Sequence, residues 1–317
     1  MAKPLPIEFH AGRNVRAHVA REGFDLADFP TLLGAAGGPK WLVLYGLDRV
    51  LAPRVKAAAR AASRPVDLIG ASIGAWRFAA WLQDDPAAAL DRLFDAYTDP
   101  RFFDGSVADF DGIGFDGIGF DALFRHYIDA LLGAHGSDEL FACDVARLHM
   151  VVSLFPESIW PVALRLGLAA LRNGFGRDRF LRSSPRRVLC STAPLPDSIG
   201  RAWPHASLEL TRARLVDALR ATAAVPGMIA PVAGLDPRGG GGRAIDGGIV
   251  DYHFDGTQAG AGFVLYPHFY ATLTPGWFDK PFRRRRIAAT SVDDLLLICP
   301  SPAFVASLPG GKVPDRA

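Results

Sequence analysis

The sequence is poor in charge and in cysteine. Only 21% of its 317 residues are charged and the formal net charge is +2, so no global field gathers nucleic acid. The three cysteines, Cys143, Cys190 and Cys299, lie far apart and show neither the paired spacing of a zinc site nor the even number of a disulfide framework. We therefore expect a reducing compartment, no metal and no nucleic-acid partner.

Long hydrophobic runs are also missing. Two prolines, a glutamate and a histidine interrupt residues 1–10, so no signal-peptide core forms there. The uncharged run at 221–235 carries Pro226 and Pro231, and a membrane span needs roughly 20 uninterrupted apolar residues. The sequence predicts a cytoplasmic protein, with peripheral contact to a membrane surface left open.

Half of the residues are hydrophobic, and their periodicity alternates between strand and helix. The expected strands are 31–36, 66–69, 148–155, 188–191, 263–266 and 295–298. The expected helices are 40–51 (ended by Pro53), 75–82, one beginning at Pro86 with Asp85 as its cap, 121–132, 160–171 and 211–224. This alternation predicts an α/β fold, a three-layer α/β/α sandwich with a mostly parallel central sheet. We expect one domain over 1–317, with a core at about 30–300, an N-terminal extension at 1–29 and a C-terminal tail at about 301–317.

The pentapeptide Phe-Asp-Gly-Ile-Gly occurs at 110–114 and again at 115–119. It lacks the regular oxygen spacing of an EF-hand loop. Its glycines predict an irregular loop, and an active-site lid is the alternative.

Gly70-Ala-Ser72-Ile-Gly74 lies between an apolar strand and an amphipathic helix, which is the context of a nucleophile elbow. An abrupt strand-to-helix turn brings the positions two before and two after the serine together, so both must lack bulk. Ser72 would then be strained and exposed, and the helix N-terminus beside it favours developing negative charge. A small-residue turn without chemistry is the simpler alternative.

Gly37 and Gly38 precede Lys40 between the first strand and its helix. Glycine backbone N–H groups can approach a substrate oxygen closely, so we expect this pair, with the Lys40 N–H as a further candidate, to stabilise an oxyanion. A phosphate-binding P-loop needs glycine before the lysine and serine or threonine after it, whereas this chain has Pro39 and Trp41.

Asp246-Gly247-Gly248 follows a short strand-like segment. Two glycines after an acid allow a tight turn that places the carboxylate against another loop, where it can accept the Ser72 proton without an imidazole. Taken alone, Asp-Gly-Gly is only a turn.

The order of Gly37-Gly38-x-Lys40, Gly-x-Ser72-x-Gly and Asp246-Gly247-Gly248 resembles the patatin-like phospholipase family. The segment Ala221-Thr-Ala-Ala-Val-Pro226 also looks like the one that precedes that family's catalytic aspartate. The resemblance covers roughly residues 30–255. It implies a patatin-like fold, a carboxylic ester hydrolase acting on phospholipid or other lipid acyl esters, Ser72 as nucleophile and Asp246 as base, an oxyanion loop at Gly37 and Gly38, and no cofactor.

The chain departs from the family at Ala36 and Trp41, where the family has further glycines. We expect Trp41 to crowd the loop and reshape the acyl pocket. Two alternatives stay open: a Ser–His–Asp triad in which His253 or His268 follows Asp246, and a catalytically weak relative that binds lipid or a protein partner in the same cleft.

A basic cluster follows the aromatic segment 277–282 and consists of Arg283, Arg284, Arg285 and Arg286. Aromatic residues beside basic ones suit an anionic membrane interface, and we expect peripheral contact there, with a solvated surface turn as the alternative.

Overall fold

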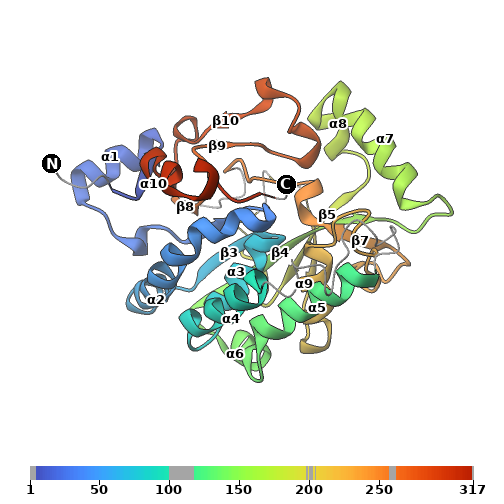
Figure 1. Ribbon diagram of the computed structural model, residues 1–317, viewed down its shortest axis with the longest axis horizontal. Helices are drawn as coiled ribbons and strands as arrows, with labels where there is room; N and C mark the ends of the chain where they lie inside the picture. The colour runs from blue at the N-terminus through green and yellow to red at the C-terminus, as the bar shows by residue number, and fades with distance from the viewer. Residues whose placement is uncertain are drawn as a thin grey trace.

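The computed structural model describes residues 5–99, 118–197, 199, 203, 205–256 and 262–315. Its centre is a mixed sheet of nine strands flanked by helices (Figure 1). The strands are β1 (Ile7–Ala11), β2 (Thr31–Gly34), β3 (Val66–Ala71), β4 (Ala146–Phe155), β5 (Arg186–Ser191), β6 (Ala206–Glu209), β7 (Arg243–Asp246), β8 (Val264–Pro267) and β11 (Leu295–Pro300). A separate two-stranded sheet joins β9 (Thr272–Leu273) to β10 (Ile287–Ala288).

The strand order is β1-β11-β8-β2-β3-β4-β5-β6, and β7 also pairs with β4. The central strands from β11 to β4 are parallel, as their near-continuous apolar sequences predict. Antiparallel pairing enters at β1, at β5 and at β7, so the sheet is mixed. The register places the carboxyl ends of β2, β3 and β7 close together, because Gly34 pairs with Gly70, Ala71 with Val151, and Asp246 with the neighbouring Val152.

One face of the sheet carries the larger helical layer. The described helices are α1 (Arg13–Glu22), α2 (Tyr45–Ala61), α3 (Ile73–Leu82), α4 (Pro86–Thr98), α5 (Ile118–Leu132), α6 (Gly136–Ala142), α7 (Val162–Phe175), α8 (Arg177–Leu181), α9 (Arg212–Thr222) and α10 (Pro302–Ser307). The first six of them and α9 share one hydrophobic core with alternate residues of the central strands, such as Leu32, Leu68 and Met150. Every residue of α3 is buried, which fixes the direction in which the chain leaves the sheet edge.

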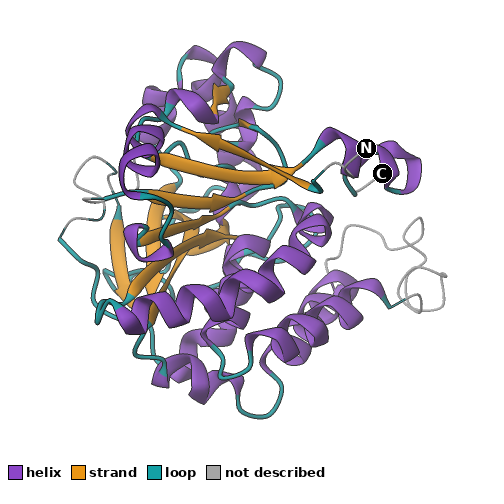
Figure 2. Ribbon diagram, turned by 90° about the vertical axis from the view of Figure 1, so that its left-hand side faces the viewer, coloured by secondary structure: helices purple, strands orange, loops and turns teal. Residues whose placement is uncertain are grey.

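The other face is covered by loops, short 3₁₀ turns and the helix pair α7–α8. Leu33, Ile69 and Val151 pack there against Tyr252, Phe269 and neighbouring aromatic residues. Figure 2 shows helices on both sides of the twisted sheet. This arrangement is an α/β architecture compatible with three layers.

Several sequence predictions need correction or placement. Pro53 does not end its helix: α2 continues to Ala61, because Pro53 lies on the exposed side while the apolar face continues through Val55 and Ala59. The preceding residues form a 3₁₀ helix, η2 (Gly38–Leu44), rather than α-helix. Residues 7–22, expected in an extension, form β1 and α1, and β1 is an edge strand of the central sheet.

The repeat at 110–119 lies almost wholly outside the described residues, so neither the loop nor the lid interpretation is tested. None of the described helices is long and apolar enough to cross a membrane.

Candidate active site

Ser72 forms a tight turn between β3 and α3. Its backbone has φ 53° and ψ −128°, a left-handed conformation that non-glycine residues rarely adopt. A Cβ at Gly70 would lie 2.6 Å from the Ala75 nitrogen, and one at Gly74 would lie 2.0 Å from the Gly34 oxygen. Both glycines are therefore sterically required, and the turn has the geometry expected of a nucleophile elbow.

Thr222 holds this turn from a distant part of the chain. Its hydroxyl oxygen accepts the Ser72 N–H at 2.9 Å and donates to the Val151 carbonyl at 2.6 Å. Thr222 is fully buried at the end of α9. Sequence analysis did not single it out, although the Ala-Thr-Ala-Ala segment containing it was the available signal.

Asp246 ends β7 beside the same turn. Its N–H donates to the Ala224 carbonyl at 2.9 Å, and its Oδ1 accepts the Gly248 N–H at 2.7 Å. A Cβ at Gly247 would lie 2.1 Å from the Val151 oxygen, and one at Gly248 would lie 2.9 Å from the Ala36 Cβ. The two glycines thus let the aspartate turn fit between β4 and the loop after β2.

The loop after β2 supplies the third component. The Ala36 N–H donates to the Tyr252 carbonyl at 3.0 Å, and the Lys40 N–H donates to the Gly37 carbonyl at 3.4 Å. The Lys40 N–H is therefore engaged within the loop, which leaves Gly37 and Gly38 as the candidate oxyanion donors. Gly38 has φ 54°, and a Cβ at Gly37 would lie 2.5 Å from the Phe269 ring.

These components line one small cavity of about 50 Å³. Its lining residues are Ala36, Gly37, Gly38, Ser72, Val225, Asp246, Tyr252, Trp277, Lys280 and Asp315. The structure therefore brings together both predicted catalytic residues and both predicted oxyanion donors, from three separate parts of the chain. A cavity that holds a drug-sized ligand has about 300–1,000 Å³, so a substrate has to displace part of this wall.

Lys280 and Asp315 form the polar part of the wall beside Ser72 and Asp246. The Lys280 ammonium lies 3.5 Å from the centroid of the Trp277 ring and 4.0 Å from that of Tyr252, a cation–π arrangement. Lys40 is buried and forms an ion pair with the half-exposed Asp315. Lys40 is therefore held beside the site by a residue of the cavity wall.

Trp41 does not crowd this cavity. Its side chain is fully buried and packs edge-on against Tyr45, Phe94 and Tyr97 in the helical layer. The 3₁₀ turn of η2 directs it away from Gly37 and Gly38. The expectation that Trp41 reshapes a pocket around the loop is wrong for the cavity of the described structure.

His253 and His268 are buried behind the cavity wall. His253 Nδ1 accepts the Thr274 N–H at 3.0 Å, and its ring stacks on Tyr252. Burial lowers the pKa of His253 well below its ordinary value and lowers the pKa of His268 to about 3. Among the described residues, those lining the Ser72 cavity include no histidine.

A Ser–His–Asp chain occurs elsewhere, and sequence analysis missed it. His149 on β4 is hydrogen-bonded through Nδ1 to the Ser191 hydroxyl at 3.0 Å and through Nε2 to Asp67 Oδ1 at 3.0 Å. Its members come from three strands, so only the sheet register could have revealed it. Ser191 is 2% exposed and has no access for a substrate.

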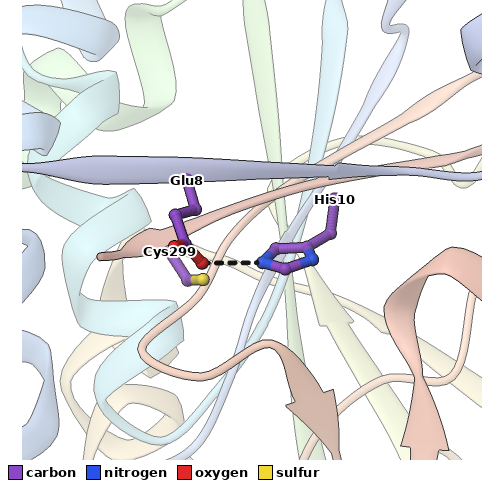
Figure 3. A group of neighbouring side chains, drawn as sticks. All are labelled: Glu8, His10 and Cys299. Carbon is purple, nitrogen blue, oxygen red and sulfur yellow. Dashed lines mark ion pairs between the residues drawn. The ribbon is translucent and has the colours of Figure 1, made fainter. Parts of the chain in front are cut away.

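One group of side chains has the composition of a metal site. Glu8 and His10 on β1 and Cys299 on β11 each offer one ligand atom, and these atoms lie within 4.8 Å of one another (Figure 3). A mixed oxygen, nitrogen and sulfur set of this kind is one that zinc accepts. Glu8 and Cys299 line a different cavity from Ser72, so the chemistry available at Ser72 uses none of these three residues.

Comparisons of this chain with protein-family models, with curated proteins and with solved structures give no match. The functional argument therefore depends on the geometry of the site.

Proposed function

We propose that this protein is a serine hydrolase of acyl esters, of the patatin-like type, that works with a Ser72–Asp246 dyad. The observation that carries the proposal is the common cavity of a backbone-strained serine, a carboxylate and two glycines. Each comes from a different segment, and Gly70, Gly74 and Gly247 are each required by a close backbone approach.

In the proposed reaction, Asp246 accepts the Ser72 hydroxyl proton while Oγ attacks the ester carbonyl carbon. The carbonyl oxygen becomes an oxyanion that the Gly37 and Gly38 N–H groups stabilise. The C–O bond to the alcohol breaks, and Asp246 returns the proton to the leaving oxygen. Water then attacks the acyl-enzyme and gives its proton to Asp246. As the bond between the acyl carbon and Oγ breaks, Asp246 passes this proton to Oγ, which releases the carboxylic acid and restores Ser72.

The positions of the histidines favour the dyad over a triad. His253 and His268 lie behind Tyr252 and Phe269 and use Nδ1 in local backbone hydrogen bonds. An imidazole that serves as base must reach the serine hydroxyl directly or through one water. Asp246 meets this requirement better, because it shares the cavity with Ser72.

We infer that the substrates are lipid acyl esters. Tyr252 and Trp277 give the cavity apolar walls, while Lys280 places one cation in the wall and Lys40 pairs with the wall residue Asp315. This combination suits an acyl chain that carries an anionic group nearby. No step of the reaction needs a metal or cofactor.

A fluorophosphonate probe, which forms a covalent bond with activated serines, tests the proposal. We expect one labelled serine in the wild-type chain, complete loss of labelling in Ser72→Ala and unchanged labelling in Ser191→Ala. A screen of short-chain and lipid esters with the same variants should give the same result. Labelling that survives Ser72→Ala would refute the assignment of the nucleophile.

The second candidate, a lipid- or partner-binding protein with little activity, has one observation in its favour. The cavity holds only about 50 Å³ and Asp315 forms part of its wall. A wild-type serine that stays unlabelled, in a protein that still binds lipid, would favour this candidate over the hydrolase.

A further inference from the structure

Helix α7 carries an unusual apolar surface on its outer side. Five exposed apolar residues recur at intervals of three or four, which places them on one face of the helix: Trp160, just before the helix, and Leu164, Leu168, Leu171 and Phe175 within it. Trp160 is 59% exposed and Phe175 is 70% exposed, and the preceding Ile159 is 96% exposed. We call these six residues the α7 stripe. The helix lies at the outer edge of the molecule, in yellow-green in Figure 1.

The inner side of α7 explains how the helix is held. Ala169 and Asn173 are buried, and Val162 and Leu166 pack on the small core around Phe155. The outer stripe is therefore a second apolar surface that folding leaves uncovered. Contiguous exposed apolar residues on this scale mark an interaction site.

The surroundings of the stripe are strongly basic. Residues 158–177 contain three arginines and no acid, and residues 280–286 contain one lysine and four arginines. The two segments are adjacent: Arg285 donates to the Gly174 carbonyl and, at 2.8 Å, to Asp279, and Asn173 also binds Asp279 at 2.9 Å. Arg283, Arg284 and Arg286 are exposed beside them.

A larger cavity lies at the end of the stripe. It has about 520 Å³ and is lined by Phe175, Arg177, Arg179 and Arg285, together with Asp178 and Asp255. Arg177 and Arg285 already donate to Asp279, so the exposed Arg179 supplies the charge that this concave site offers beside the exposed Phe175. This chemistry fits the phosphate or carboxylate of a lipid headgroup whose chains lie along the helix.

We propose that the α7 stripe is a membrane-docking face that inserts into an anionic lipid surface, with the neighbouring arginines contacting the headgroups. The 14 residues of α7 are too few to span a bilayer, so the helix would lie in the interface plane. A second copy of this chain is a poorer occupant, because a symmetric dimer through the stripe would bring the same arginines together.

The buried side of α7 is bonded to the turn that carries part of the wall of the Ser72 cavity. Asp279, which binds Asn173 and Arg177, belongs to the turn η5 (Trp277–Asp279), and the cavity is lined by Trp277 and Lys280. Docking would therefore place the cavity wall beside the lipid surface. This consequence for substrate supply rests on the proposed hydrolase function, whereas docking itself does not.

Co-sedimentation with vesicles tests docking without relying on hydrolysis. The full chain carrying Ser72→Ala, which consumes no lipid, is mixed with vesicles of phosphatidylcholine alone or of phosphatidylcholine with phosphatidylserine. We expect binding to the anionic vesicles, weakened at least about tenfold by Leu168→Asp or Leu171→Asp, since each removes one buried apolar side chain from the lipid. Arg284→Gln should weaken binding about fivefold and reduce its salt dependence.

The matched control is Phe24→Asp, which changes a 51% exposed aromatic residue on a different part of the surface and should leave binding unchanged. Unchanged hydrolysis of a short soluble ester by Leu168→Asp with Ser72 intact would show that the variant is folded. Vesicle binding that is absent in the wild type, or equal in Leu168→Asp and the wild type, overturns the proposal. Gel filtration tests the alternative. If the wild type is a dimer that does not bind vesicles, and Leu168→Asp is a monomer, the stripe binds a second copy of the chain instead.

Discussion

Two sites among the described residues combine a serine with an aspartate, and they differ in instructive ways. Ser191, His149 and Asp67 form a continuous hydrogen-bonded chain in the order of a catalytic triad, yet they are sealed within the sheet. Ser72 and Asp246 lack an imidazole but line a cavity, with the serine in a strained backbone conformation and two glycines opposite. Hydrogen-bond order alone therefore does not identify a nucleophile; access and a prepared oxyanion site do so better.

The two aspartates should give the largest contrast. Asp246→Asn keeps an Oδ1 that can accept the Gly248 N–H but removes the base, so we expect kcat for ester hydrolysis to fall about 10²–10⁴-fold. Asp67→Asn removes the corresponding charge of the buried chain and should change kcat little. Steady-state kinetics on the best ester from the screen measure both, and equal losses in the two variants would contradict the dyad.

The two threonines beside these serines offer the next test. Thr222→Val leaves the Ser72 N–H and the Val151 carbonyl without partners, and should lower the free energy of unfolding by about 2–3 kcal/mol and slow probe labelling. Thr192→Val removes a single acceptor, the one that binds the Leu148 N–H, and should cost about 1 kcal/mol without affecting labelling. Urea unfolding and labelling rates are the measurements. Normal labelling in a destabilised Thr222→Val would show that the elbow does not need this hydroxyl.

The histidines behind the cavity predict a pH effect on stability. Burial lowers the pKa of His268 to about 3, whereas the pKa of this residue in the unfolded chain is about 6.5. Below about pH 6.5 the unfolded chain binds a proton at His268 that the folded chain does not bind. The free energy of unfolding therefore falls as the pH drops toward 3. At pH 5 this proton uptake by the unfolded chain lowers the free energy of unfolding by about 2 kcal/mol.

Urea unfolding at pH 7.5 and at pH 5 measures this loss. His268→Asn retains an oxygen that can accept the Tyr270 N–H and should lose less stability between the two pH values than the wild type. An identical loss in both proteins would mean that His268 is protonated in the folded state.

The smallest expected effect concerns the cavity wall. Asp315→Asn weakens the ion pair with Lys40, and because the Asp315 side chain is 55% exposed, the pair contributes at most about 1 kcal/mol. If Asp315 obstructs entry to Ser72, its substitution should speed labelling up to about fivefold. Slower labelling would instead indicate that Asp315 helps to organise the site.

The backbone requirements of the site could be predicted from sequence because they are local. Gly70, Ser72 and Gly74 specify a turn by sterics alone, and Asp246-Gly-Gly specifies another. The contacts that join these turns could not be predicted, because Thr222 meets Ser72 only after α9 packs on the sheet. The fold class followed from the alternating periodicity, whereas the antiparallel strands β5 and β7 depend on pairing partners that periodicity does not encode.

Tertiary context also overrode two local expectations. Proline disfavours helix interiors, but Pro53 is exposed and α2 continues past it because Val55 and Ala59 still bury their side chains. Trp41 follows the glycine loop in sequence, yet the 3₁₀ turn directs its side chain into the aromatic packing of Tyr45 and Phe94. Sequence distance from a motif was a poor guide to distance from the site.

The hydroxyl of Thr222 has a consequence for the order in which the protein matures. It arrives 150 residues after the turn that it secures. During synthesis, the pentapeptide around Ser72 is complete before α9 has been translated. At that stage the chain lacks the Thr222 hydroxyl that holds the Ser72 turn in its strained conformation. We therefore expect Ser72 of the nascent protein to be unreactive until the second half of the chain is made. A fragment that ends before α9 should not be labelled by a fluorophosphonate, even if its first strands have formed.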